Sequence, residues 1–167
     1  MSEPSTTMLI REGRTAEILL VEDNRGDAQL ASMAFREARI ENHLTVAVTG
    51  EDAMELLRDP SRRPPDLVLL DLNLPKMSGR EVLVAIKEDP RLMHIPVIML
   101  SASENEQDIA RSYELHATAY IIKPLTLEKF RDVVSTIEQF FFFLAVLPDA
   151  TYATATSNAA WFDANDH

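Results

Sequence analysis

The 167-residue sequence contains no cysteine. This absence excludes a disulfide framework, a zinc ribbon and a thiol nucleophile. Basic residues are also few, because 16 Lys and Arg stand against 27 Asp and Glu, which gives a net charge of -11. The only short basic group, Arg62-Arg63, lies in a Pro-rich segment, and we interpret it as loop solvation. We therefore expect no nucleic-acid surface.

Long hydrophobic runs are absent as well. No apolar stretch reaches the ~20 residues that a membrane-spanning helix needs, and Met1–Pro4 is too polar for a signal peptide. We therefore expect a cytoplasmic protein with no membrane segment. The histidines His43, His94, His116 and His167 lack the spacing of a metal site, so we interpret them as structural.

Strand and helix patterns alternate along most of the chain. Residues 1–16 form a polar lead without periodicity, which we expect to be a flexible arm. The expected strands are residues 17–22, 44–48, 67–70, 96–100 and 119–122. The expected helices cover residues 28–38, the segment from Thr49 to the break at Pro60, residues 80–88, 105–115, and 126 to about 145. Five such repeats predict an α/β protein with a doubly wound parallel sheet and helices on both faces.

Polar residues follow four of the expected strands. These residues are Glu22 and Asp23, Asp71, Ser101, and Lys123. The carboxyl ends of parallel strands lie at one edge of the sheet, where ligands bind. Packed carboxylates repel one another unless a cation neutralises them, and oxygen ligands suit Mg²⁺. A carboxylate can also attack phosphorus while a metal and a Lys screen the developing charge. The cluster predicts a metal-assisted phosphoacceptor.

Each of these residues also has a simpler interpretation. Asp71 could be a turn residue at the end of a strand. Glu22, Asp23 and Ser101 could cap the helices that follow them. Lys123 could be a solvated surface side chain. We favour the functional interpretation because all five residues fall together at neighbouring strand ends.

Four sequence blocks resemble the receiver domain of bacterial two-component response regulators, of the CheY-like type. The blocks are residues 21–24 (VEDN), 70–79 (LDLNLPKMSG), 96–103 (PVIMLSAS) and 120–124 (YIIKP). Their order and spacing agree with that family over residues 17–148, which we expect to form one receiver domain followed by a tail at 149–167. The resemblance implies a flavodoxin-like (βα)5 fold with strand order 2-1-3-4-5.

The resemblance implies roles for the acidic residues. Asp71 would accept a phosphoryl group from a histidine kinase. Glu22, Asp23, Asp71 and the backbone carbonyl of Asn73 would hold Mg²⁺ or Mn²⁺. Asn73 and Ser103 occupy positions where the family tunes the access of the hydrolytic water. The protein would then be a phosphoacceptor rather than an enzyme, with Mg²⁺-dependent self-phosphorylation from small donors and slow dephosphorylation.

It also implies roles for residues on the far strands. Ser101 would be a switch hydroxyl that moves toward the phosphoryl group, and Lys123 would pair with that group. Pro124 would follow Lys123 through a cis peptide bond. Tyr120 would be an aromatic switch that rotates inward, although a static core aromatic is the alternative.

A narrower resemblance is to the single-domain response regulators that accompany cyanobacterial and bacterial phytochromes. It rests on residues 22–27 (EDNRGD) and 139–148 (QFFFFLAVLP), and it implies a phytochrome-type histidine kinase as partner. The consecutive aromatics Phe140, Phe141, Phe142 and Phe143 would spread over all sides of a helix, so one core cannot bury them all. We expect them to form a homodimer contact, and an extended edge of the core is the alternative.

Three hypotheses of function remain. The first is a stand-alone phosphorelay receiver, which would signal to a downstream protein because residues 149–167 are too few for an output module. The second is a receiver-like adaptor that works without phosphorylation, which the complete acidic, hydroxyl and Lys set disfavours. The third is a phosphatase of the haloacid dehalogenase type. Such an enzyme needs an Asp two residues after its nucleophile, and this sequence has Asn73 there.

Overall fold

The computed structural model describes residues 15–123 and 126–139. The strands are β1 (Ala16–Val21), β2 (Asn42–Ala47), β3 (Leu67–Leu70), β4 (Val97–Ser101) and β5 (Ala119–Ile122). The helices are α2 (Arg25–Arg36), α3 (Gly50–Arg58), α4 (Gly79–Glu88), α5 (Glu106–Glu114) and α6 (Leu127–Ile137). These elements follow the expected alternation, with ends shifted by a few residues. The part of the last helix that we expected beyond residue 139 lies outside the described residues.

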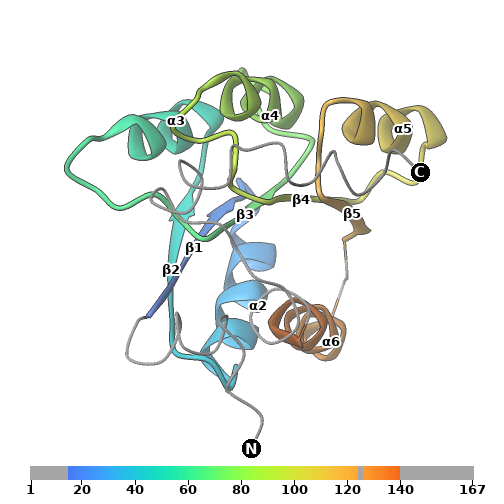
Figure 1. Cartoon of the computed structure of the whole chain (residues 1–167). Helices are drawn as coiled ribbons and strands as arrows, with labels where there is room; N and C mark the ends of the chain where they lie inside the picture. The colour runs from blue at the N-terminus through green and yellow to red at the C-terminus, as the bar shows by residue number, and fades with distance from the viewer. Residues whose placement is uncertain (1–14, 124–125, 140–167) are drawn as a thin grey trace, which may run out of the picture.

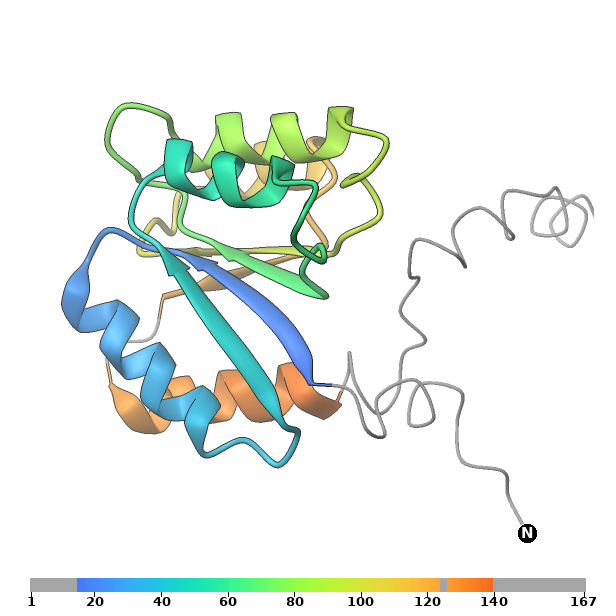
Figure 2. The same ribbon diagram turned by 90° about the vertical axis from the view of Figure 1, so that its left-hand side faces the viewer.

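The strands form one parallel sheet in the order β2-β1-β3-β4-β5. Helices α3, α4 and α5 cover one face, and α2 and α6 cover the other (Figures 1 and 2). The predicted flavodoxin-like fold is therefore confirmed. Because β2 and β3 lie on opposite sides of β1, the connections after β1 and β3 leave toward opposite faces and open a crevice at the carboxyl edge.

Side-chain alternation along the strands builds two hydrophobic cores. In β1, Leu19 and Val21 pack with residues of α3 and α4, whereas Ile18 and Leu20 pack with residues of α2 and α6. All four residues of β3 are buried, as the unbroken apolar run predicted. Burying each such Leu stabilises the fold by about 1.5–3 kcal/mol. The sheet is therefore a rigid platform for residues at its edge.

Every described helix begins at a polar side chain that accepts a backbone N–H from its first turn. The N-cap residues are Asn24, Thr49, Ser78, Asn105 and Thr126. The expected cap at Thr126 is therefore present. None of Glu22, Asp23 and Ser101 caps a helix, so that simpler interpretation is wrong for all three.

Several expectations fall outside the described residues. They concern most of the arm, the tail at 149–167, the Phe140–Phe143 dimer contact and the peptide bond between Lys123 and Pro124. Ala16, which we placed in the arm, is buried and begins β1. Among the helices of the described segments, none combines the length and the apolar character that crossing a membrane requires.

Candidate functional site

Backbone pairing brings the predicted site residues to one edge of the sheet. The N–H of Asp71 donates to the carbonyl of Val21 at 3.0 Å, and the N–H of Lys123 donates to the carbonyl of Ser101 at 2.7 Å. These bonds continue the pairing just past the ends of β3 and β5. The side chains that follow the strands are therefore fixed by the sheet rather than by loops.

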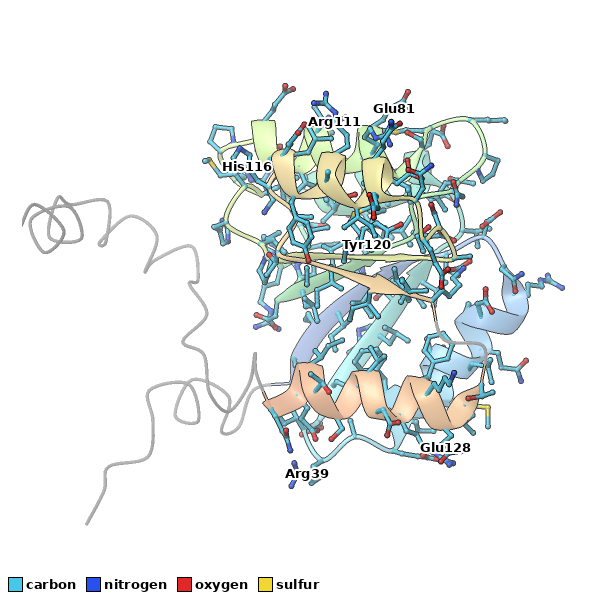
Figure 3. The ribbon with its side chains drawn as sticks, turned by 90° about the vertical axis from the view of Figure 1, so that its right-hand side faces the viewer. Arg39, Glu81, Arg111, His116, Tyr120 and Glu128 are labelled. Atoms are coloured by element: carbon cyan, nitrogen blue, oxygen red, sulfur yellow. The ribbon has the colours of Figure 1, made fainter. Side chains whose placement is uncertain are left out.

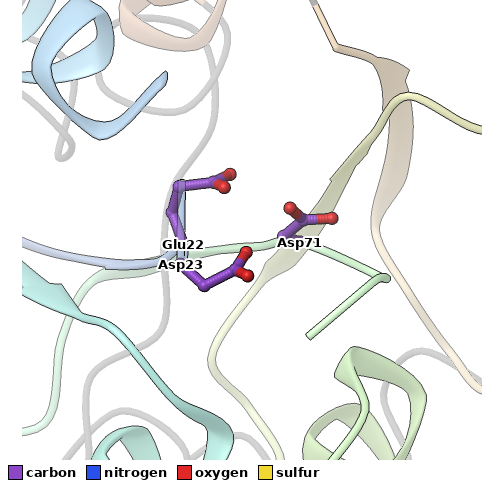
Figure 4. Close-up of side chains that lie close together, drawn as sticks. All are labelled: Glu22, Asp23 and Asp71. Atoms are coloured by element: carbon purple, nitrogen blue, oxygen red, sulfur yellow. The ribbon is translucent and has the colours of Figure 1, made fainter. Parts of the chain in front are cut away.

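Three carboxylates meet at this edge. Glu22, Asp23 and Asp71 each place a carboxylate oxygen within 4.8 Å of the other two (Figure 4). Glu22 and Asp71 are buried, whereas Asp23 is exposed. Negative charges this close repel one another, and an oxygen-only donor set suits a hard divalent cation such as Mg²⁺ or Mn²⁺. The residues present therefore fit the predicted metal.

Lys123 forms ion pairs with two members of this cluster and with a third carboxylate outside it. Its Nζ is 2.8 Å from Oε2 of Glu22, 2.9 Å from Oδ2 of Asp71 and 2.9 Å from Oδ2 of Asp27. Burial favours a lower pKa for the Lys123 ammonium, but its bonds to the three carboxylates outweigh burial and raise the pKa above its ordinary value. Lys123 is therefore a buried cation, and the solvated-surface interpretation is wrong.

Asp27 is a site residue that the sequence interpretation missed. It lies in the first turn of α2, and its side chain keeps a 22% exposed fraction while it contacts Lys123. A signal was present in the sequence, because the acidic pair Glu22-Asp23 follows β1 and α2 begins two residues after Asp23. The first turn of such a helix stands at the edge of the crevice.

The protonation of Glu22 depends on its surroundings. Burial raises the pKa of Glu22 to about 7, and the charge of Asp71 acts in the same direction. Lys123 and the N–H of Asn24, which donates to Oε1 at 3.0 Å, oppose the rise. The carboxyl of Glu22 therefore exchanges its proton near neutral pH, and a bound cation would favour the ionised form.

Asn73, Ser101 and Ser103 form a polar chain beside Asp71. The N–H of Asn73 donates to Oδ1 of Asp71 at 3.0 Å, and its side-chain amide donates to Oγ of Ser101 at 3.4 Å. The N–H of Ser103 donates to the same hydroxyl at 3.2 Å. Asn73 and Ser103 therefore orient the buried hydroxyl of Ser101. Asn73 lies two positions after Asp71, and Ser103 lies two positions after Ser101.

Tyr120 lies on β5 on the side of the sheet that α5 covers (Figure 3). Its hydroxyl donates to the backbone carbonyl of Ser103 at 2.8 Å. Oγ of Ser103 donates to Asp108 at 2.7 Å, and Asp108 accepts from Arg80 of α4 at 3.2 Å. A connected set of polar contacts therefore runs from Ser101 beside Asp71 to α4 and α5.

Gly79 shapes the loop that follows Asp71. A Cβ at this position would lie 2.0 Å from the backbone oxygen of Asp71 and 2.8 Å from Cα of Leu72. The N–H of Gly79 also donates to the carbonyl of Leu72 at 3.0 Å. The first residue of α4 therefore packs against the backbone of Asp71, an approach that only glycine permits.

Comparison with known proteins agrees with this geometry. Residues 18–135 match the family model described as the response regulator receiver domain. The chain is 41% identical over 137 residues to the response regulator Rcp1 of Synechocystis sp. (strain PCC 6803), covering 80% of this chain and 93% of that protein. The chain therefore belongs to the response regulator receiver domain family, which consists of signalling proteins.

Two solved structures are similar over the same region. One is described as the phosphorylated cyanobacterial phytochrome response regulator RcpA, with 43% identity, a TM-score of 0.76 and coverage of 81% of this chain and 99% of that chain. The other is described as the Mn²⁺-bound form of response regulator Rcp1, with 40% identity, a TM-score of 0.73 and coverage of 80% and 99%. The likeness therefore includes both fold and sequence.

Proposed function

We propose that this protein is a phosphorelay receiver in which Asp71 accepts a phosphoryl group from a histidine kinase. The contact that carries the proposal joins Nζ of Lys123 to Oδ2 of Asp71 at 2.9 Å, and both side chains are buried. A buried cation beside a buried carboxylate is suited to a reaction that adds negative charge at that carboxylate. Membership of the receiver family supports the same role.

The transfer forms one bond and breaks another. A carboxylate oxygen of Asp71 attacks phosphorus of the kinase phosphohistidine, and the N–P bond breaks as the O–P bond forms. Lys123 stabilises the charge on the phosphoryl oxygens. Mg²⁺ or Mn²⁺, held by Glu22, Asp23, Asp71 and the backbone carbonyl of Asn73, would supply further positive charge to these oxygens when bound.

The response to phosphorylation is proposed to pass through Ser101 and Tyr120. The hydroxyl of Ser101 turns toward the phosphoryl group, and Tyr120 rotates inward as the β4–α5 loop moves. The existing bonds from Ser103 to Ser101 and from Tyr120 to Ser103 support this order, because they join the two switch residues through one loop residue. The cis peptide bond between Lys123 and Pro124 remains a prediction.

The partners are proposals as well. RcpA is described as a phytochrome response regulator, and this likeness supports a phytochrome-type histidine kinase as phosphoryl donor. We propose cytoplasmic signalling to a downstream protein and a homodimer contact through residues 140–143. Self-phosphorylation from small donors and slow dephosphorylation belong to the same proposal.

Phosphate-affinity gel electrophoresis tests the central proposal. After incubation with acetyl phosphate and Mg²⁺, the wild-type protein should give a retarded band, and Asp71→Asn should give none. Asp52→Asn is a matched control because Asp52 is exposed on α3. A missing band in the wild type, as an adaptor predicts, or a band that survives Asp71→Asn, would contradict the proposal.

A further inference from the structure

Lys123 forms ion pairs with three carboxylates, one of which, Asp27, has no part in the proposed phosphoryl transfer. An ammonium group carries three N–H donors, and Nζ of Lys123 lies within 2.9 Å of three carboxylates, those of Glu22, Asp27 and Asp71. All three contacts are ion pairs, and the one with Asp71 is also a hydrogen bond. A phosphoryl oxygen must compete with one of these carboxylates to gain its bond to Lys123.

Asp27 differs from the other two carboxylates. Glu22 and Asp71 belong to the acidic cluster with Asp23, whose charge a divalent cation would neutralise, and Asp27 is not part of that cluster. Phosphorylation also replaces the carboxylate charge of Asp71 by that of the phosphoryl group. With the cation and the phosphoryl group in place, Asp27 would be the one of the three carboxylates whose charge neither of them changes.

The position of Asp27 is set by the start of α2. Its backbone N–H donates to Oδ1 of the N-cap Asn24 at 3.0 Å. Gly26 leaves room for this cap, because a Cβ there would lie 3.3 Å from the same oxygen. The side chain of Asp27 therefore extends from a capped turn toward Lys123.

We propose that Asp27 is a positioning residue that competes with the phosphoryl group for Lys123. This inference rests on the proposed function, because it concerns the same pocket. Asp27 weakens the binding of phosphoryl oxygens by neutralising part of the charge that should stabilise them. Asp27 acts through its ion pair with Lys123, and the proposal requires no contact between Asp27 and the reacting oxygen of Asp71.

A simpler role is that Asp27 only stabilises α2, because an acidic residue in a first helical turn interacts favourably with the helix dipole. Asp52 provides the matched control for that role. It occupies the same position in α3, its N–H donates to the cap oxygen of Thr49 at 3.0 Å, and its side chain is exposed. A dipole effect should appear equally in Asp27→Asn and Asp52→Asn.

Calorimetric titration with beryllofluoride at saturating Mg²⁺ tests the proposal. Asp27→Asn should bind beryllofluoride about fivefold more tightly than the wild type, which corresponds to the upper range for a partly exposed ion pair. Asp52→Asn should bind with unchanged affinity. Tighter binding cannot arise from a folding defect. Equal or weaker binding by Asp27→Asn would overturn the proposal.

A second measurement needs no metal. Urea unfolding in EDTA should show that Asp27→Asn lowers the midpoint in the wild-type background and lowers it less in a Lys123→Met background. Equal effects in both backgrounds would overturn the ion-pair role. If the wild-type protein itself fails to bind beryllofluoride, the proposed function falls together with the inference. If the wild type binds and Asp27→Asn does not differ from it, only the inference falls.

Discussion

The hydroxyl of Tyr120 donates a hydrogen bond of 2.8 Å to the backbone carbonyl of Ser103. Ser103 also donates its N–H to the hydroxyl of Ser101 and its own hydroxyl to Asp108 in the first turn of α5. A single loop residue therefore joins the aromatic of β5, the site hydroxyl and the start of α5. Any movement of Ser101 must change at least one of these contacts.

Tyr120→Phe removes the hydrogen bond to the carbonyl of Ser103 and keeps the aromatic ring. We expect the free energy of unfolding to fall by about 1 kcal/mol, because one partly buried hydrogen bond is lost. Phosphoryl acceptance should persist, since Asp71 and Lys123 are untouched. Urea unfolding and a phosphate-affinity gel measure the two effects. Ser103→Ala removes other hydrogen bonds but keeps the carbonyl acceptor of Tyr120, so Tyr120→Phe should lower stability by a similar amount in that background. An unchanged stability or a lost gel shift would contradict the prediction.

Gly79→Ala should displace the backbone of Asp71, the proposed phosphoacceptor. The added Cβ would overlap the backbone oxygen of Asp71, so we expect a loss of about 3 kcal/mol in stability and a strongly reduced rate of phosphorylation by acetyl phosphate. Gly26→Ala also places a Cβ in a first helical turn, but its nearest contact would be 3.3 Å. That control should change stability by less than about 1 kcal/mol. Similar effects of both substitutions would show that the close approach is unimportant.

The raised pKa of Glu22 should make the stability of the protein depend on pH. Its pKa of about 7 lies above its ordinary 4.5, so the folded protein holds more protons than the unfolded chain between these values. This group's contribution to the stability of the metal-free protein should therefore fall as pH rises from about 5 through 7. Urea midpoints measured in EDTA across this range test the slope.

Glu22→Gln is the control for that slope and should flatten it. Mg²⁺ should raise the urea midpoint of the wild type more at about pH 8 than at about pH 6, because at the lower pH the cation must displace a proton from Glu22. A slope that persists in Glu22→Gln would assign the titration to another group.

The buried carboxylate of Glu138 should contribute more to the free energy of unfolding than exposed carboxylates do. It follows α6 and accepts hydrogen bonds from the N–H of Ile40 at 2.8 Å and from Nε of Arg39 at 3.2 Å. Glu138→Gln replaces one acceptor by a donor, so we expect a loss of about 1–2 kcal/mol in urea unfolding. Glu114→Gln breaks an exposed pair with Arg111 at 3.2 Å and should cost less than about 0.5 kcal/mol. Equal losses would contradict the prediction.

The sheet was predictable because buried parallel strands have unbroken apolar sequences. The run 67–70 predicted β3 with its exact bounds. Glu22, Asp71, Ser101 and Lys123 could be placed together for the same reason, since the end of each strand fixes the position of the next side chain.

What the sequence could not provide were contacts between segments. Asp27 contacts Lys123, 96 positions later, because the fold places the first turn of α2 near the residue that follows β5. Gly79 gives no sign in the sequence that it touches the backbone of Asp71. The helix predicted to extend to Ala38 ends at Arg36, because the chain turns there at the C-cap Glu37. Such features depend on how elements approach one another, which apolar periodicity does not encode.

The contacts of Glu138 at the end of α6 have a mechanical consequence. The helix begins four residues after Lys123, and Glu138 ties its other end to the loop between α2 and β2, where Figure 3 labels Arg39. Its 11 residues span about 16 Å and do not stretch. Because Glu138 holds one end of α6, a shift of Lys123 that displaced the first turn of this helix would rotate the whole helix about Glu138. The exposed face of α6 would then change its angle to the sheet instead of moving parallel to it.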